Sequence, residues 1–294
     1  MVKNVVEINS HVLPSPWHLR DKTFAWGQRT YLMGVLNVTP DSFSDGGQFD
    51  TVETAVAQAR HLVAAGIDIL DVGGQSSRPQ AVEVSLEEEL HRVLPVVIAL
   101  RRECQTPISV DTTRAAVAQA AVEAGADVVN DISGGTYDPE MLPTVARLGV
   151  AIVLMHLRGT PQSMQQLTNY TDLIGEIQNF LEQRIQAAIA VGIDFTKIAI
   201  DPGIGFAKTG AQNLEILRHL GKFRSMGCPI LVGLSRKSFI GHILNQPDPQ
   251  ARVWGTAAAC AGAIAGGADL LRVHDGPQMR DVCRVADALW RFHA

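Results

Sequence analysis

The stretch Tyr31-Leu-Met-Gly-Val-Leu-Asn37 is apolar until it ends in an amide, and seven further short runs repeat this pattern along the chain. Continuous apolarity, rather than alternation, is typical of parallel strands that are buried on both faces. The eight runs therefore predict an α/β fold, a (β/α)8 TIM barrel with a short N-terminal extension. After Tyr31–Asn37 they are Ile67–Asp71, Ile108–Asp111, Val128–Asp131, Ile152–His156, Ile198–Asp201, Ile230–Ser235 and Leu270–His274.

Segments with helical periodicity separate these runs. In Val52–Ala65 the apolar residues recur three and four positions apart, which gives a helix one apolar face. The same spacing occurs in Leu173–Ile189 and Val282–Trp290. Several segments end in a glycine just before the next strand, as helices with a left-handed final residue do. These glycines are Gly66, Gly125, Gly192 and Gly267.

Length and composition favour one domain. The 294 residues are 46% hydrophobic, which suits a single large core. We expect residues 1–30 to form an arm or hairpin that closes the barrel bottom, and residues 31–294 to form the barrel domain. No apolar run is long enough for a signal peptide or a membrane span, so a cytoplasmic protein without membrane contact is expected. The four cysteines lack metal-like spacing, which predicts reduced, packed thiols; they are Cys104, Cys228, Cys260 and Cys283.

The charge is unevenly placed. A net charge of -5 argues against a nucleic-acid-binding protein. Five cationic or imidazole side chains nevertheless occur at or just after strand ends, which a barrel gathers on one face. This pattern predicts a small anionic substrate. The side chains are Lys208, Arg236, Lys237, Arg272 and His274.

The segments after the first two strands carry oxygen and guanidinium groups. Asn37–Asp45 offers an amide, hydroxyls and carboxylates, which suit Mg²⁺ but also an ordinary polar turn. Asp71–Pro79 combines glycines with Arg78, whose forked donors suit phosphate or carboxylate. Three long connections are candidate lids over the site: Thr39–Asp50, Gln75–Ser85 and Leu157–Tyr170.

Four polar residues end the middle strands. Asp111 and Asn130 can hydrogen-bond the edge of a heterocycle, whereas we expect Asp131 to cap the following helix. His156 is interpreted as a buried histidine with its hydrogen bonds satisfied. The small residues of Ala257–Ala268 fit internal packing and a dimer interface equally well.

The last three strands carry the strongest motifs. Asp201–Lys208 combines an acid, a glycine-rich turn, an aromatic ring and a cation, a set suited to a planar polar ring. Ser238 opens a helix whose N-terminus can take an anionic group. Arg272 and His274 are two positions apart on the last strand, so both side chains point to the same face. A guanidinium beside an imidazole suits stacking on an aromatic ring and binding of diphosphate.

Residues 31–290 resemble the dihydropteroate synthase family. The resemblance rests on Asn37–Gly47, Asp71–Pro79, Asp201–Phe206, Ser235–Ser238 and Arg272–His274, which match the family's motifs in order. It implies condensation of 7,8-dihydropterin-6-ylmethyl diphosphate with 4-aminobenzoate to 7,8-dihydropteroate and diphosphate, with Mg²⁺ as cofactor. We expect the protein to be a homodimer.

The resemblance also implies roles for individual residues. Catalytic roles fall to Asp111, Lys237 and Arg272, and the metal ligand is Asn37. The pterin contacts are Asp111, Asn130, Met155, Asp201, Gly233, Lys237 and Arg272. The diphosphate contacts are Asn37, Ser77, Arg78, Arg272 and His274. The 4-aminobenzoate contacts are Phe43, Pro79, Phe206 and Ser238.

Three residues depart from the family pattern. Gln75 replaces the usual Glu, Ser77 the usual Thr, and Ala207 a common Gly. We expect activity to survive with altered loop closure. The expected mechanism is ionisation of the diphosphate followed by amine attack, with Asp111 stabilising the cationic ring and no nucleophilic side chain.

Two other functions are alternatives to this one. A methyltetrahydrofolate-binding methyltransferase barrel shares the pterin pocket but does not need the two closing loops or Ser235–Ser238. A non-catalytic pterin-binding protein is disfavoured by the retained Asn37, Asp111, Lys237 and His274.

Overall fold

A parallel eight-stranded barrel forms the body of the protein. The computed structural model describes residues 13–39, 48–76, 78 and 81–291. The strands run in the order β8-β7-β6-β5-β4-β3-β10-β9, and a bridge between Ile200 and Ile230 joins the two ends of the sheet. The predicted barrel is confirmed. The strands are β3 (Tyr31–Asn37), β4 (Ile69–Gly73), β5 (Ile108–Asp111), β6 (Val128–Asp131), β7 (Ala151–Met155), β8 (Ile198–Asp201), β9 (Leu231–Gly233) and β10 (Leu270–Val273).

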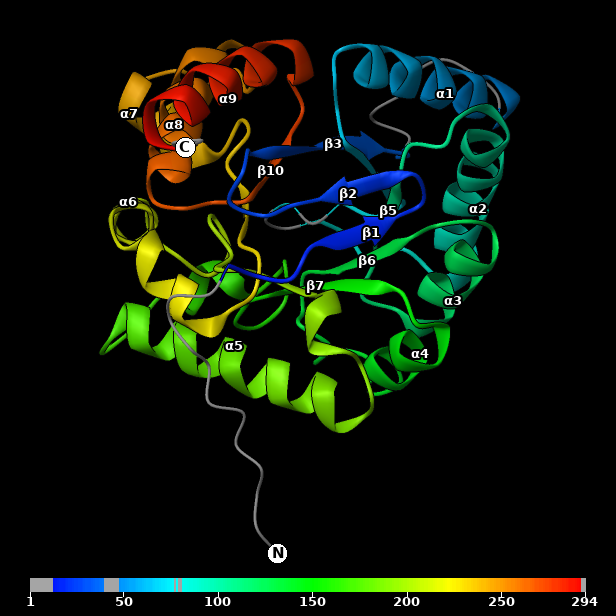
Figure 1. Ribbon diagram of the computed structural model, residues 1–294, viewed down its shortest axis with the longest axis horizontal. Helices are drawn as coiled ribbons and strands as arrows, with labels where there is room; N and C mark the ends of the chain where they lie inside the picture. The colour runs from blue at the N-terminus through cyan, green and yellow to red at the C-terminus, as the bar shows by residue number, and fades with distance from the viewer. Residues whose placement is uncertain (1–12, 40–47, 77, 79–80, 292–294) are drawn as a thin grey trace, which may run out of the picture.

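Helices surround the barrel as an outer ring (Figure 1). The three predicted helical segments are confirmed in α1, α5 and α9, except that α1 ends at Ala64, one residue before the predicted Ala65. All four predicted glycines have positive φ, from +92° at Gly66 to +117° at Gly125. The helices are α1 (Gln48–Ala64), α2 (Leu86–Glu103), α3 (Ala115–Glu123), α4 (Met141–Leu148), α5 (Leu173–Ala190), α6 (Gly210–Arg218), α7 (Ser238–Leu244), α8 (Val253–Ala265) and α9 (Gly276–Trp290). Short 3-10 turns are η2 (Met164–Gln166), η3 (Phe195–Lys197), η4 (Leu220–Met226) and η5 (Gln250–Arg252).

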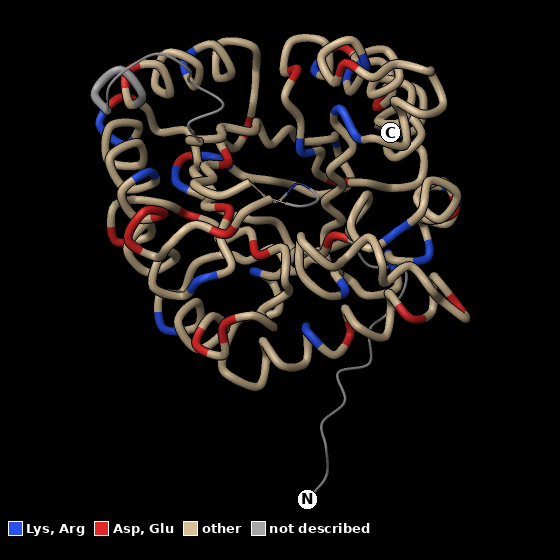
Figure 2. Tube along the Cα trace, turned by 180° about the vertical axis from the view of Figure 1, so that it is seen from behind, with Lys and Arg blue, Asp and Glu red and all other residues tan. Residues whose placement is uncertain are grey.

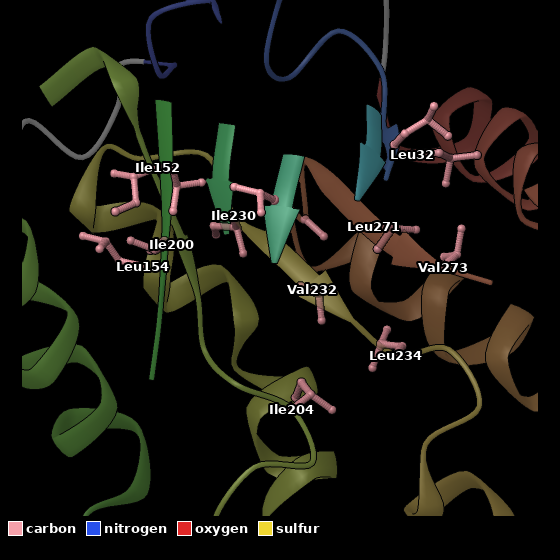
Figure 3. Close-up of a cluster of buried hydrophobic side chains, with 14 of the residues drawn as sticks. Leu32, Ile152, Leu154, Ile200, Ile204, Ile230, Val232, Leu234, Leu271 and Val273 are labelled. Carbon is pink, nitrogen blue, oxygen red and sulfur yellow. The ribbon is translucent and has the colours of Figure 1, made fainter. Parts of the chain in front are cut away.

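Each strand divides its side chains between two environments. Ile152 and Leu154 of β7, Ile200 of β8 and Leu271 of β10 belong to the buried apolar cluster between strands and helices (Figure 3). Because side chains alternate along a strand, the intervening residues face the barrel interior. Both faces of every strand are thus enclosed, which explains the continuous apolar runs.

A hairpin covers the N-terminal end of the barrel. Strands β1 (Trp17–Leu19) and β2 (Lys22–Phe24) pair antiparallel, and they lie across the barrel in Figure 1. Trp17, Phe24 and Trp26 share one apolar cluster with residues near the starts of the barrel strands, among them Tyr31 and Ile69. The aromatic side chains fill this end, so the opposite end remains for a site.

Some strand limits differ from the predicted ones. β4 begins at Ile69 rather than Ile67, because the Asp68 carboxylate accepts hydrogen bonds from the backbone N of Leu32 and from Arg29 at the barrel bottom. The cysteines are free thiols, three of them buried, as predicted. Within the described residues, no helix is both long and apolar enough to cross a membrane.

Candidate active site

Arg272 lies between two carboxylates inside the barrel. Its Nε donates to Asp71 Oδ2 at 2.6 Å and its Nη2 donates to Asp111 Oδ2 at 2.7 Å. Asn130 Nδ2 also donates to Asp71 Oδ2, at 3.2 Å. These side chains come from β10, β4, β5 and β6, and strands β10 and β4 are not neighbours, so the contacts cross the barrel interior. The predicted residues Asp111, Asn130 and Arg272 therefore meet in one place.

Burial sets the electrostatics of this group. It raises the pKa of Asp111 to about 7, against the opposing effect of Arg272 and with a further increase from Asp71. Burial alone lowers the pKa of Arg272, but the two carboxylates raise it above its usual value. The guanidinium is therefore a fixed positive charge, whereas Asp111 titrates near neutral pH.

A second acid and a lysine form the opposite wall. Asp201, at the end of β8, accepts a hydrogen bond from Gly203 N at 2.7 Å, and burial raises its pKa to about 6. Burial lowers the pKa of Lys237 to about 8, while Asp201 acts in the other direction. The Lys237 ammonium lies 4.1 Å from the centre of the Phe206 ring, a cation–π contact. A cation, an acid and an aromatic face are thus combined.

Gly205 allows the Lys237 side chain to approach the turn after β8 closely. Gly205 has a φ of +83°, and a Cβ there would lie 3.2 Å from Lys237 Nζ. Met155, at the end of β7, is buried in the same apolar cluster as Ile132 and the Phe206 ring. The turn after β8 therefore brings Phe206 and Lys237 together over an apolar base.

His274 is held as a neutral imidazole at the rim. Its Nδ1 lies 3.0 Å from Ser235 Oγ, which also accepts from the His274 backbone N. Burial, together with Arg272 and Arg236, lowers the pKa of His274 to about 3. Arg236 is close enough to affect His274, but its guanidinium is ion-paired with Asp275 at 2.6 Å.

Asn37 and Gly73 meet where β3 and β4 end. The two residues are paired in register, and a Cβ at Gly73 would lie 3.8 Å from Asn37 Oδ1 and 3.4 Å from Asp111 Cβ. This glycine lets the amide and the acid approach each other. Arg78 is exposed and contributes to the lowered pKa of His274, so it lies on the same side.

The remaining predicted residues are placed as follows. Gly233 ends β9 beside Arg272, with 4.0 Å between an added Cβ and Arg272 Cβ. Ser238 is exposed at the start of α7. Phe43, Ser77 and Pro79 lie outside the described residues.

The C-terminal end of the barrel also carries a pocket next to Asp111. Figure 2 shows this end of the molecule, where acidic and basic positions both occur toward the centre. The pocket opens between the connections that follow β4, β5, β6 and β7, so loops from four strands border the site. Its lining is Gln75, Ser76, Ala81, Glu83, Glu89, Asp111, Thr112, Thr113, Ile132, Tyr137, Thr160, Pro161 and Gln162.

His156 and Asp131, which lie at or just after the ends of their strands, are both buried. His156 is buried and bonded to Lys208 Nζ at 3.0 Å, as expected of a satisfied histidine. The prediction that Asp131 caps a helix is wrong. Its carboxylate accepts from Ser133 N and Gly135 N, within a local turn well before α4 begins at Met141.

Asp71 is the residue that sequence reasoning did not assign to the site. It ends one of the apolar runs, which marked it as a candidate, but nothing in the sequence indicates its contact with Arg272, 201 positions away. Its Oδ1 and the neighbouring Ser109 Oγ are buried without a hydrogen-bond partner. The barrel floor thus holds more polar groups than the motifs revealed.

Comparisons with known proteins identify relatives over nearly the whole chain. The model of the family described as pterin binding enzyme matches residues 33–274. The dihydropteroate synthase of Synechocystis sp. is 56% identical over 282 residues, covering 96% of this chain and 98% of that protein. The dihydropteroate synthase of Bacillus subtilis is 42% identical, covering 92% and 93%.

Solved structures agree in fold. The Xanthomonas albilineans dihydropteroate synthase in complex with 7,8-dihydropteroate gives a TM-score of 0.85 at 40% identity, covering 95% of this chain and 100% of that one. The same organism's enzyme with 4-aminobenzoic acid gives 0.88 at 42% identity, with the same coverage.

Proposed function

Because this chain belongs to the dihydropteroate synthase family of pterin-binding enzymes, it is a transferase of folate biosynthesis, and we propose how its residues carry out the reaction. The reaction joins 7,8-dihydropterin-6-ylmethyl diphosphate to 4-aminobenzoate and releases diphosphate. The observation that carries the residue assignment is the bridging of Asp71 and Asp111 by Arg272 inside a barrel that also holds Asp201 and Lys237.

The pterin ring is proposed to enter the barrel between these two walls. Asp111, Asn130 and Asp201 offer acceptors and a donor to the ring's polar edge, and Lys237 adds a further donor. The guanidinium plane of Arg272 stacks on the ring, with Gly233 leaving room beside it and Met155 forming the apolar base.

Carbon–oxygen cleavage precedes amine attack in this proposal. The leaving diphosphate takes the bonding electron pair, and the pterin ring delocalises the resulting positive charge. Ionised Asp111 stabilises this cation in the low-dielectric barrel interior. The amine nitrogen of 4-aminobenzoate then attacks the methylene carbon and loses a proton, so no enzyme nucleophile is needed.

The diphosphate is assigned to the rim. His274 is neutral, and when the Ser235 hydroxyl donates to Nδ1, the opposite nitrogen, Nε2, carries the proton and can donate to phosphate. Arg78 and Arg272 supply positive charge, and Ser77 a hydroxyl. The loops that bear Phe43, Ser77 and Arg78 are proposed to close over the substrates.

Mg²⁺ fits the residues at this rim. The described residues contain no cluster of three or more carboxylate, imidazole or thiol side chains able to hold a metal ion. Asn37 offers a hard amide oxygen, and Mg²⁺ typically uses few protein ligands, taking the rest from water and substrate phosphate. When bound, the ion neutralises the developing charge on diphosphate.

The amine subsite is assigned to Phe206, Ser238, Phe43 and Pro79. The Phe206 ring supplies an aromatic face, and the exposed Ser238 hydroxyl at the start of α7 can receive the carboxylate. Positive charge from Lys237 above the ring favours the anionic substrate.

Assembly and location are also proposed. Large apolar side chains are exposed at Trp254, Val285 and Leu289 of α8 and α9, which supports a homodimer through these helices. A cytoplasmic location agrees with the free thiols. Light scattering that gives the mass of one chain at micromolar concentration would contradict the dimer.

A product assay tests the reaction and the metal separately. With both substrates and Mg²⁺, we expect dihydropteroate and diphosphate in equal amounts, and no dihydropteroate without 4-aminobenzoate. Addition of a chelator should reduce the rate, and Mg²⁺ should restore it. An Asn37→Ala variant should need more Mg²⁺ for half-maximal rate. Full activity in chelator would overturn the metal assignment alone, whereas absence of product with Mg²⁺ would overturn the function.

A further inference from the structure

Lys208 is buried directly behind the active-site wall. Only 3% of the residue is exposed, and it follows the turn after β8. Its Nζ donates to the carbonyl oxygen of Phe206 at 2.9 Å and lies 3.0 Å from His156 Nδ1. Burial and the adjacent lysine lower the pKa of His156 to about 2, so the ring is neutral and Nδ1 accepts. Both hydrogen-bond partners of this lysine are therefore uncharged.

Such a placement is energetically unfavourable. A buried cation without a directly bonded anion is destabilising, and burial lowers the pKa of Lys208 to about 7 even though Asp201 acts in the opposite direction. An apolar side chain of similar length would fill this space without that cost. The lysine therefore calls for an explanation beyond packing.

The turn after β8, which Lys208 holds, is strained and is also hydrogen-bonded to the connection 157–170. Ala207 has a φ of +50°, which L-residues other than glycine rarely adopt, and its carbonyl oxygen accepts from Tyr170 Oη at 3.0 Å. Gln212 Nε2 also donates to Thr168 O at 2.8 Å. The connection 157–170, predicted as a lid, is thus tied to the turn after β8 at these points.

The residue fixed between these bonds is Phe206. Its carbonyl is held by Lys208, the next carbonyl is held by Tyr170, and its ring lies under the Lys237 ammonium at 4.1 Å. Lys208 therefore holds the backbone of Phe206 and Tyr170 holds that of Ala207, while the Phe206 ring contacts Lys237 of the site.

We propose that Lys208 is a positioning residue for the amine subsite: it fixes the Phe206 turn so that the ring and the Lys237 ammonium keep the spacing that receives 4-aminobenzoate. This inference rests on the proposed assignment of Phe206 to that subsite. Lys208 acts through its hydrogen bond to the Phe206 carbonyl, and Tyr170 supports it through the Ala207 carbonyl, one residue further on.

Four variants test this role by steady-state kinetics. Lys208→Met removes the hydrogen bonds of Lys208 to Phe206 O and His156 Nδ1. Tyr170→Phe removes a different hydrogen bond, from Tyr170 Oη to Ala207 O. Phe206→Ala tests the subsite itself. Lys22→Met is the matched control, because Lys22 Nζ also donates to a backbone carbonyl, Asp68 O at 3.3 Å, but at the barrel bottom.

The Michaelis constants for both substrates are measured at pH 7.5, where Lys237, with a pKa of about 8, is still mostly protonated. Asp201, with a pKa of about 6, remains ionised there, so the loss of a neighbouring positive charge does not protonate it. Lys208 is then mostly a neutral amine, which still has two N–H donors. The comparison therefore isolates the hydrogen bonds.

Lys208→Met is expected to raise KM for 4-aminobenzoate about fivefold, the scale of one lost hydrogen bond, and to leave KM for the pterin diphosphate within about twofold. Tyr170→Phe should raise KM for 4-aminobenzoate by less than Lys208→Met does, and Phe206→Ala should raise it by more. Lys22→Met should leave KM for both substrates unchanged. The proposal is overturned if Phe206→Ala raises KM for 4-aminobenzoate but Lys208→Met does not, or if Lys208→Met raises both constants equally. If Phe206→Ala has no effect, the subsite assignment fails and this inference fails with it.

Discussion

Arg272 Nε donates to Asp71 Oδ2 over 2.6 Å, and this contact orients the guanidinium that also reaches Asp111. Asp71 is fully buried, so loss of its charge leaves Arg272 with one carboxylate instead of two. Asp71→Asn should lower the free energy of unfolding by about 3 kcal/mol. It should also raise KM for the pterin diphosphate about tenfold, because the stacking plane and the Asn130 amide lose their anchor.

Asp68→Asn is the matched control for this prediction. Asp68 also pairs with an arginine, Arg29 at 2.7 Å, but at the closed end of the barrel. Denaturant unfolding should show that it destabilises the protein, while KM for the pterin diphosphate stays unchanged. Equal pterin KM values in the wild type and Asp71→Asn would refute the anchoring role.

Asp111 is expected to act more on the transition state than on binding. Its carboxylate is buried and faces a ring that becomes cationic during the reaction. Asp111→Asn should lower kcat about a hundredfold or more and change pterin affinity much less. Single-turnover rates and equilibrium pterin binding separate the two quantities, and equal losses in both would count against cation stabilisation.

The pH dependence of kcat/KM should be a narrow bell. Burial raises the pKa of Asp111 to about 7, and its ionised form is the active one, so activity rises as pH increases through that value. Burial lowers the pKa of Lys237 to about 8, and its protonated form is needed, so activity falls above that value. Asp111→Asn should remove the acidic limb near pH 7 and leave at most one near pH 6, from Asp201, whereas an unchanged limb near pH 7 would assign it to another group.

Ala207 should be replaceable by glycine with a gain in stability. Its φ of +50° costs a non-glycine residue roughly 1 kcal/mol, part of which Ala207→Gly recovers. We expect the free energy of unfolding to rise by about 0.5 kcal/mol in urea denaturation. Ala263→Gly, at an equally buried position within α8, should instead lower it by about 1 kcal/mol. A loss of stability in Ala207→Gly would show that the turn is not strained.

The barrel itself was predictable because its strands are enclosed on both sides. β3, β5, β6 and β8 begin and end at the predicted residues. The limits of β4 could not be predicted, because they depend on Asp68 contacting Arg29 and Leu32, which belong to another part of the chain.

The candidate site was predictable only in part. Strand-ending residues such as Asp111 and Asp201 were recognisable, since the ends of parallel strands meet at one end of a barrel. The contacts that these side chains make with one another could not be predicted. The sequence places Arg236 and Lys208 among the five strand-end groups expected to meet a substrate. In the structure the Arg236 guanidinium is ion-paired with Asp275, and Lys208 bonds two neutral acceptors behind the wall.

The sequence by itself determined the barrel, its family and the side chains available at the strand ends. Burial on both faces of a strand and local turn chemistry depend on residues that are close together in the sequence. Only the tertiary structure decided which of those side chains contact each other. The pairing of Arg272 with Asp71, and the neutral state of His156 beside Lys208, arise from distances across the barrel and from exclusion of water, and neither is encoded locally.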